Sequence, residues 1–357
     1  MRLETLTFAA HFPTNRVAKA RLAHIFLALA LCVVAFFSLT VGATDVSLRD
    51  ALWKLIYGQP LTRIEAIVLW EIRAPRLVLG LIVGAALAVG GAVMQGLFRN
   101  PLAEPGLVGV SAGAGLGAIS AIVLGALTPI WITQLIGNHL LPVAAFLGGW
   151  CSTLLLYQVS TRRGRTSVAT MLLAGIALGA LAGAVSGILV FISDDQQLRD
   201  LTFWGLGSLS GASWDKVSTA GPIILFSVLF ACRLGRGLNA LALGEATAAH
   251  IGLNVQHVKH LAILTVAAAT GAAVAVSGGI GFIGIVVPHL LRLATGPDHR
   301  PLLINSALLG ALLLVLADMI ARTAIAPSEL PIGIVTAVLG APVFLWILLR
   351  QRGMVDL

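Results

Sequence analysis

Ten long apolar runs limit what this chain can fold into. They lie near residues 25–43, 77–97, 107–127, 140–158, 169–192, 217–232, 261–279, 282–295, 303–324 and 332–349. A helix needs about 20 apolar residues to cross the hydrocarbon core of a bilayer, and most of these runs are close to that length. Because backbone polar groups inside lipid must be bonded within the chain, the runs are expected to be membrane-spanning helices. The eighth run is short and contains Pro288, which makes it the weakest of the ten.

The composition supports a membrane protein. Hydrophobic residues make up 58% of the 357 residues and charged residues only 11%, whereas soluble domains carry about 25% charged residues. This excludes a water-soluble enzyme, a disordered chain and a disulfide-linked scaffold. The net charge of +8 does not indicate nucleic-acid binding, because the basic residues stand between the apolar runs. The predicted fold class is an all-α polytopic membrane protein, with one transmembrane domain over residues 1–357 and the lipid bilayer as its surroundings.

With ten spans, both termini lie on the same side of the membrane. The terminal side holds 15 Lys and Arg residues and the opposite side holds 8. This excess predicts that both termini are cytoplasmic, with residues 1–24 as a tail and 44–76 as an external loop. A basic lead and the small residues at 41–43 also resemble a secretory signal peptide. The first run has 19 residues, which exceeds the usual apolar region of about 7–15 residues and favours a retained span.

The external loop 44–76 shows signs of structure. Ser47 and Asp50 resemble a capping box. An apolar helical face follows, which predicts a short interfacial helix; it comprises Leu48, Leu52, Leu55 and Ile56, with Trp53 beside it. The loop ends in Arg73-Ala-Pro-Arg76. These two cations either anchor the membrane edge or bind an acidic partner.

Three other loops are more than connectors. Residues 99–106 carry two prolines and a glycine, which predict a tight cytoplasmic turn that is either a gate or a plain turn. Residues 193–216 place Trp204 and Trp214 at headgroup depth, with glycines that bend the backbone between them. Residues 233–260 are mildly apolar with basic flanks, and we expect two short cytoplasmic helices broken near Gly252.

Ionisable residues inside the apolar runs are few. Asp318 and Arg322 lie one helical turn apart in the ninth run. Either this pair neutralises itself, or Arg322 faces a partner outside the membrane. His289 is expected to be a hydrogen-bonded packing residue, with a proton relay or ligand as the alternative. A gradient-driven secondary transporter would need such residues in several spans, and Asp318 alone is weak support for one.

Motifs for nucleotide hydrolysis and metal binding are missing. The sequence has no Gly-x-x-x-x-Gly-Lys-Ser/Thr loop and no His-Glu-x-x-His. We therefore expect no enzymatic activity, no metal and no cofactor in this chain, and energy for transport would come from a partner or a gradient. The three cysteines have no metal or redox spacing and are expected to be buried as small apolar residues; they are Cys32, Cys151 and Cys232.

Five segments form a long and specific signature. They are Arg73-Ala-Pro-Arg76, Gly84-Ala-Ala-Leu-Ala-Val-Gly-Gly-Ala-Val-Met-Gln-Gly96, Arg99-Asn-Pro-Leu-Ala-Glu-Pro-Gly-Leu-Val-Gly109, Gly281-Phe-Ile-Gly-Ile-Val-Val-Pro-His-Leu-Leu-Arg292 and Glu329-Leu-Pro-Ile-Gly-Ile-Val-Thr-Ala-Val-Leu-Gly-Ala-Pro342. With them, the chain from about residue 25 onward resembles the iron–siderophore, haem and cobalamin permeases of type II ABC importers.

The resemblance implies a homodimer of ten-helix subunits in the bacterial inner membrane, with the transport path along the dimer axis. It also implies two cytoplasmic ABC ATPase subunits, which bind ATP and Mg, and a periplasmic substrate-binding protein. In such permeases, arginines of the Arg-x-Pro-Arg element and one near the end of the ninth helix bind glutamates of the binding protein. The corresponding residues here are Arg73, Arg76 and Arg322. Contacts of this kind set the orientation in which the binding protein docks and the rate at which it meets the permease.

The resemblance also implies roles for residues on the inner side. The segment from 241 to 252 looks like the family's coupling helices, which lie in a groove of the ATPase, and it includes Leu241, Gly244, Glu245, Ala246 and Gly252. The cytoplasmic gate of similar proteins uses the turns after the second and fourth helices, which here contain Asn100, Leu102, Thr166 and Ser167. The fifth span is expected to line the path through Met171, Leu172 and Ile176.

The sequence indicates the substrate less clearly than it indicates the class of transporter. Residues 203–214 look most like haem permeases, whereas residues 73–105 look equally like cobalamin permeases. Haem is the expected substrate, and a ferric siderophore or cobalamin stays open as the alternative. The path of such permeases is thought to be unspecific, with the binding protein choosing the ligand.

Overall fold

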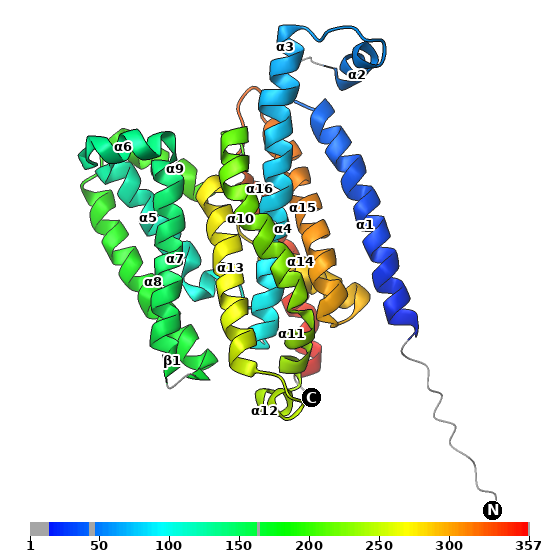
Figure 1. The fold of residues 1–357 in the computed structure, drawn as a ribbon, viewed down its shortest axis with the longest axis vertical. Coiled ribbons are helices and arrows are strands. Elements are labelled where there is room, and N and C mark those ends of the chain that lie inside the picture. The colour runs from blue at the N-terminus through cyan, green and yellow to red at the C-terminus, as the bar shows by residue number, and fades with distance from the viewer. Residues whose placement is uncertain (1–13, 43–46, 163–164, 356–357) are drawn as a thin grey trace, which may run out of the picture.

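The computed structural model describes residues 14–42, 47–162 and 165–355. Within them, long helices stand side by side and shorter helices join them at both ends (Figure 1). Eight helical stretches are long and apolar enough to cross a membrane, and two shorter apolar helices accompany them. Together they correspond to the ten expected spans, which are α1 (Thr14–Thr40), α4 (Ala74–Phe98), α5 (Val110–Leu124), α7 (Leu140–Ser160), α8 (Val168–Phe191), α10 (Trp214–Arg233), α13 (Val255–Ser277), α14 (Ile283–Thr295), α15 (His299–Thr323) and α16 (Ile332–Val355).

Short elements occupy the connections. They are α2 (Leu48–Ile56), α3 (Arg63–Ala66), η1 (Ile67–Arg73), η2 (Pro105–Val108), η3 (Gly125–Leu127), α6 (Ile130–Ile136), η4 (Gly137–His139), β1 (Thr161–Arg162), β2 (Arg165–Thr166), α9 (Asp195–Leu206), α11 (Gly235–Ala242) and α12 (Glu245–His250). The β1–β2 hairpin and α12 mark one end of the bundle (Figure 1). The charge distribution assigns this end to the cytoplasm, and we call it the cytoplasmic end.

The second span begins earlier than the sequence predicts. Residues 63–98 form one continuous helical stretch through α3, the π-helical η1 and α4, so the prediction of a loop up to residue 76 is wrong. Thr62 starts this stretch, because its hydroxyl accepts the N–H of Glu65 in a capping box. Pro75 lies where η1 passes into α4 and has no N–H to donate along the helix. The Trp70 carbonyl, five residues back, accepts the indole N–H of Trp214 instead. The interfacial helix α2 forms as predicted, and Ser47 accepts the N–H of Asp50.

Helix α4 is the centre of the subunit, and it packs against α10, α13, α14 and α15. Glycines allow backbones to approach it closely. A Cβ on Gly91 would lie 1.9 Å from the carbonyl oxygen of Gly284 in α14, and one on Gly84 would lie 2.4 Å from that of Gly310 in α15. Such contacts are how helices associate in lipid, where no hydrophobic force drives them together.

Helix α9 ends inside the bundle. Gly207, with φ +70°, follows it and accepts the N–H of Ile332, while Ser208 donates to Ser277. The predicted bend in the backbone is therefore present. The indole N–H of Trp204 is buried inside the subunit, and its expected position at headgroup depth stays a prediction. Trp214 lies at the surface and donates to the Trp70 carbonyl at 2.7 Å.

Other expectations need correction. Cys32 and Cys151 are exposed on the surface of the subunit and Cys232 is half-buried, because hydropathy does not distinguish a lipid-facing position from a core position. His289 is buried, but no described residue hydrogen-bonds its Nε2. The two short cytoplasmic helices form, yet the break between them falls at Gly244, and Gly252 lies in the turn that follows α12.

Candidate coupling and gating site

Helices α11 and α12 carry the residues assigned to ATPase coupling. Helix α11 packs on α4 and α15, and α12 projects beyond the bundle at the cytoplasmic end (Figure 1). Leu241 is buried in the core of the subunit, and its role in coupling stays a prediction. Ala246 and Gly252 are exposed, and Gly244 and Glu245 are half-buried. The exposed surface available to a cytoplasmic partner is therefore on α12 and the turn after it.

Helix α12 is tied to a gate residue through a buried lysine. The Lys259 ammonium, in the first turns of α13, lies 2.7 Å from the Glu245 carboxylate of α12. The same ammonium donates to the Thr166 carbonyl at 2.9 Å, and the Gln256 side chain accepts the N–H of Thr166 at 2.9 Å. Sequence reasoning missed Lys259, because its second partner is a main-chain oxygen 93 positions away. A displacement of α12 would therefore act directly on the turn before α8.

The two predicted gate turns differ in the burial and the hydrogen bonds of their residues. Thr166 is buried, whereas Ser167 is exposed and caps α8 by accepting the N–H of Thr170. In the other turn Asn100 is exposed, and its side chain accepts the N–H of Leu102 at 3.0 Å. Leu102 is half-buried. The gating role of these four residues stays a prediction.

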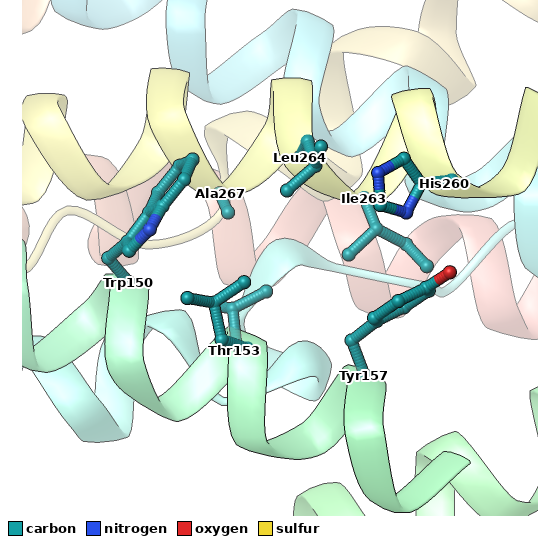
Figure 2. A pocket seen from close by; sticks show the side chains of 8 residues that line it. Trp150, Thr153, Tyr157, His260, Ile263, Leu264 and Ala267 are labelled. Atoms are coloured by element: carbon teal, nitrogen blue, oxygen red, sulfur yellow. The ribbon is translucent and has the colours of Figure 1, made fainter. Parts of the chain in front are cut away.

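Side chains of α7 and α13 face each other next to the β1–β2 hairpin. Figure 2 shows Trp150, Thr153 and Tyr157 of α7 facing Ala267, Leu264, Ile263 and His260 of α13. The rings of Tyr157 and His260 lie 5.1 Å apart, edge to face. Since α7 leads directly into β1, both strands of the hairpin are positioned by α13.

The predicted path residues of α8 do not share one surface. Met171 is buried in the core, and its place on the path stays a prediction. Leu172 is half-buried, and Ile176 is 68% exposed on the subunit surface. Three glycines spaced four apart, Gly179, Gly183 and Gly187, each have open space where a Cβ would project.

The three predicted docking arginines form a buried cluster at the opposite end of the bundle. Arg76 binds Asp318 through Nε and Nη2, both at 2.9 Å from Oδ1, and binds Glu329 through Nη1 at 2.8 Å. Arg322 donates to the carbonyl and hydroxyl of Ser38 and lies 3.6 Å from Asp318. Arg73 donates to two carbonyls at the end of α1, those of Leu39 and Thr40.

This geometry changes the interpretation of the arginines. Their exposed fractions are between 3% and 6%, so an acidic partner cannot reach the guanidinium groups in this conformation. Asp318 is bound mainly by Arg76 from α4, so the expectation that it pairs chiefly with Arg322 is wrong. The cluster fastens α1, α4, α15 and the Glu329 loop to one another.

Residues 30–350 match a family described as the FecCD transport family. The chain belongs to this family. As a FecCD protein it is the permease of an ABC importer, a multi-span protein of the bacterial inner membrane, and the family is not one of hydrolases.

Similar proteins agree with the FecCD assignment. The chain is 45% identical to the hemin transport system permease protein HmuU of Yersinia pestis, over 95% of this chain and 98% of that protein. It is 42% identical to the vitamin B12 import system permease protein BtuC of Shigella boydii, over 91% and 94%. A solved inward-facing metal-chelate type ABC transporter covers 92% of this chain and 98% of its own, with a TM-score of 0.80 and 31% identity.

This FecCD chain also holds a polar cavity inside the subunit that the sequence did not reveal. It has a volume of about 210 Å³ and lies between η2, α4, α5, α9, α13 and α14. Glu104 lines it together with Trp204 and Thr270. The Thr270 hydroxyl and the Trp204 N–H are buried, and no described residue hydrogen-bonds either atom. Burial raises the pKa of the Glu104 carboxyl above its ordinary value.

Replacing Glu104 by glutamine is expected to stabilise the protein at pH 7.5 and to have little effect near pH 4.5. In the folded state the carboxyl holds its proton to higher pH than in the unfolded state. Its contribution to stability is therefore present below the ordinary pKa of 4.5 and is lost as pH rises through the raised value. Each unit by which the pKa is raised corresponds to about 1.4 kcal/mol.

The measurement is the apparent Tm in detergent across this pH range. Glu71→Gln, at an exposed position, is the control. A gain for Glu104→Gln that is equal at both pH values would contradict the assignment.

Proposed function

We propose that this chain is the permease subunit of a haem importer and moves haem from the periplasm to the cytoplasm. The observation that carries the proposal is the similarity to the hemin permease, which spans 95% of the chain at 45% identity. Cobalamin is the second candidate, supported by the 42% identity to the B12 permease over 91% of the chain. The resemblance of residues 203–214 to haem permeases also favours haem.

The permease works as a homodimer in this proposal, and α8 faces the second copy. Its glycines at 179, 183 and 187 form a small-residue stripe of the kind that brings membrane helices into close contact. Ile176, exposed on the same helix, would line the path beside this contact.

Two ABC ATPase subunits, which bind ATP and Mg, act on the cytoplasmic end. Helix α12 is their proposed docking element, because it projects from the bundle (Figure 1) and is linked to Thr166 through Lys259. A periplasmic binding protein delivers the substrate at the opposite end. Since the arginine cluster is buried, docking would use the surface around it unless the cluster opens.

Growth of a strain that lacks this chain tests the substrate. The strain is grown in parallel on haem, on a ferric siderophore and on cobalamin as the limiting nutrient, with and without the gene on a plasmid. Loss of growth on haem alone, restored by the plasmid, is the expected result. Loss on cobalamin alone would replace haem by the second candidate, and loss on the siderophore alone would exclude both.

A further inference from the structure

A large cavity lies at the cytoplasmic end, beside the coupling helices. Its volume is about 830 Å³, and its walls are the first turns of α1, the end of α11 and the segment that joins α14 to α15. Pockets of about 300–1,000 Å³ are typical of sites that hold drug-sized ligands. The cavity is therefore much larger than a simple ion requires.

The cavity carries an excess of positive charge. Arg16, Arg21 and Arg300 line it, and Asp298 is the one carboxylate among its lining residues. Asp298 is engaged by the side chain of Asn239 at 2.6 Å and by the Arg300 N–H at 3.0 Å. Burial opposes the ionisation of Asp298, but these hydrogen bonds and the nearby positive charge of Arg300 lower its pKa. Within residues 14–42, 47–162 and 165–355, no carboxylate forms a salt bridge within 4.0 Å of any of the three guanidinium groups.

Part of the remaining lining is apolar. Val17, Leu243 and Ile304 contribute aliphatic side chains to the cavity. The next turns of α1 expose Leu22 and Phe26, which is the pattern of a lipid-facing helix. A ligand that fits must combine a negatively charged group with apolar parts and must reach the cavity at the depth of the membrane surface.

The walls are held in place by a buried amide. Asn305 of α15 is fully buried, and its amide nitrogen donates to the Ala20 carbonyl of α1 at 3.2 Å. Its carboxamide oxygen lies 3.2 Å from His24 Nδ1. These contacts fix α1 against α15, so the arginines of α1 and Arg300 are presented in a defined arrangement.

We propose that this cavity binds the headgroup of an anionic phospholipid from the cytoplasmic leaflet. The guanidinium groups of Arg16, Arg21 and Arg300 would bind the phosphate, because their planar donors match its oxygens. The aliphatic lining would contact the glycerol and the first methylenes of the acyl chains. Basic pockets between membrane helices on the cytoplasmic side are a known form of lipid recognition.

Native mass spectrometry of the full-length protein tests this. The protein in detergent is titrated with dioleoylphosphatidylglycerol, with dioleoylphosphatidylcholine and, separately, with inorganic phosphate as a competitor. We expect phosphatidylglycerol to bind more tightly than phosphatidylcholine. In the triple variant Arg16→Gln, Arg21→Gln, Arg300→Gln, its affinity should fall by about tenfold or more, because three charge-assisted contacts are lost.

A matched variant separates the cavity from overall charge. Arg162→Gln, Arg233→Gln and Arg236→Gln remove three exposed cations from the same end of the bundle but outside the cavity, and should keep the parent affinity. Equal losses in both triple variants would overturn the proposal, as would equal binding of the two lipids. Competition by millimolar phosphate would show an anion site rather than a lipid site. If the cavity variant does not fold, Arg21→Gln and Arg300→Gln are compared singly.

Discussion

Replacing Arg76 by methionine will lower the stability of the subunit by about 3–5 kcal/mol, the usual cost of leaving a buried ion without its partner. Asp318 is 2% exposed and takes its shortest contacts from Arg76, whereas Arg322 lies 3.6 Å away. Methionine fills much of the same volume, so the loss arises from the unpaired carboxylate and not from a cavity. The measurement is the apparent Tm of the purified protein in nanodiscs.

Two further variants test whether the loss of stability comes from the unpaired Asp318 carboxylate. Arg63→Met removes an exposed arginine from the same helical stretch and should keep the parent Tm. Arg76→Met combined with Asp318→Asn removes both charges and should lose less stability than Arg76→Met alone. If Arg76→Met keeps the parent Tm, the guanidinium is not a structural tie in the membrane, and its predicted role in docking a binding protein regains support.

Replacing Lys259 by methionine will uncouple ATP hydrolysis from transport in the assembled importer. The ammonium joins Glu245 of α12 to the carbonyl of Thr166, so its loss disconnects the proposed ATPase-docking helix from the turn before α8. The Glu245 side chain is 43% exposed and can be solvated without its partner, so the fold should persist. The amount of substrate moved per ATP hydrolysed should fall by about 2- to 30-fold, which corresponds to a coupling of about 0.5–2 kcal/mol.

The test uses proteoliposomes that contain the permease and its ATPase, with uptake and hydrolysis measured together. Lys259→Arg should retain part of the coupling, because it keeps the charge and a donor at the same place. Lys19→Met, at an exposed site of α1, is the control. An unchanged ratio in Lys259→Met would show that movement of α12 reaches the gate by another route.

The spans could be predicted from the sequence because lipid imposes a local requirement on every residue of a run. Contacts between distant residues could not be predicted in the same way. The sequence predicted a pair between Asp318 and Arg322 because they share a helical face. The main partner of Asp318 is instead Arg76, 242 positions away. The external loop was predicted to reach residue 76, but the π-helical segment runs directly into α4.

The candidate site was predicted only in outline. The predicted coupling residues Ala246 and Gly252 are exposed, but Leu241 and Met171, which the same family resemblance singles out, are buried. Apolar residues that face lipid, a partner or the core look alike in a sequence, which is also why the cysteines were misplaced. Glu104 belongs to the signature, yet its cavity could not be predicted from the sequence, because six separate elements enclose it.

The attachment at Thr166 has an evolutionary consequence. Both Lys259 and Gln256 bind main-chain atoms there, the carbonyl and the N–H, which every residue except proline possesses. The side chain at 166 contributes one hydroxyl contact, with Thr161. Substitutions at 166 can therefore accumulate among descendants of this gene while the mechanical connection is inherited unchanged. We expect the selective constraint to fall on Lys259, Gln256 and Glu245.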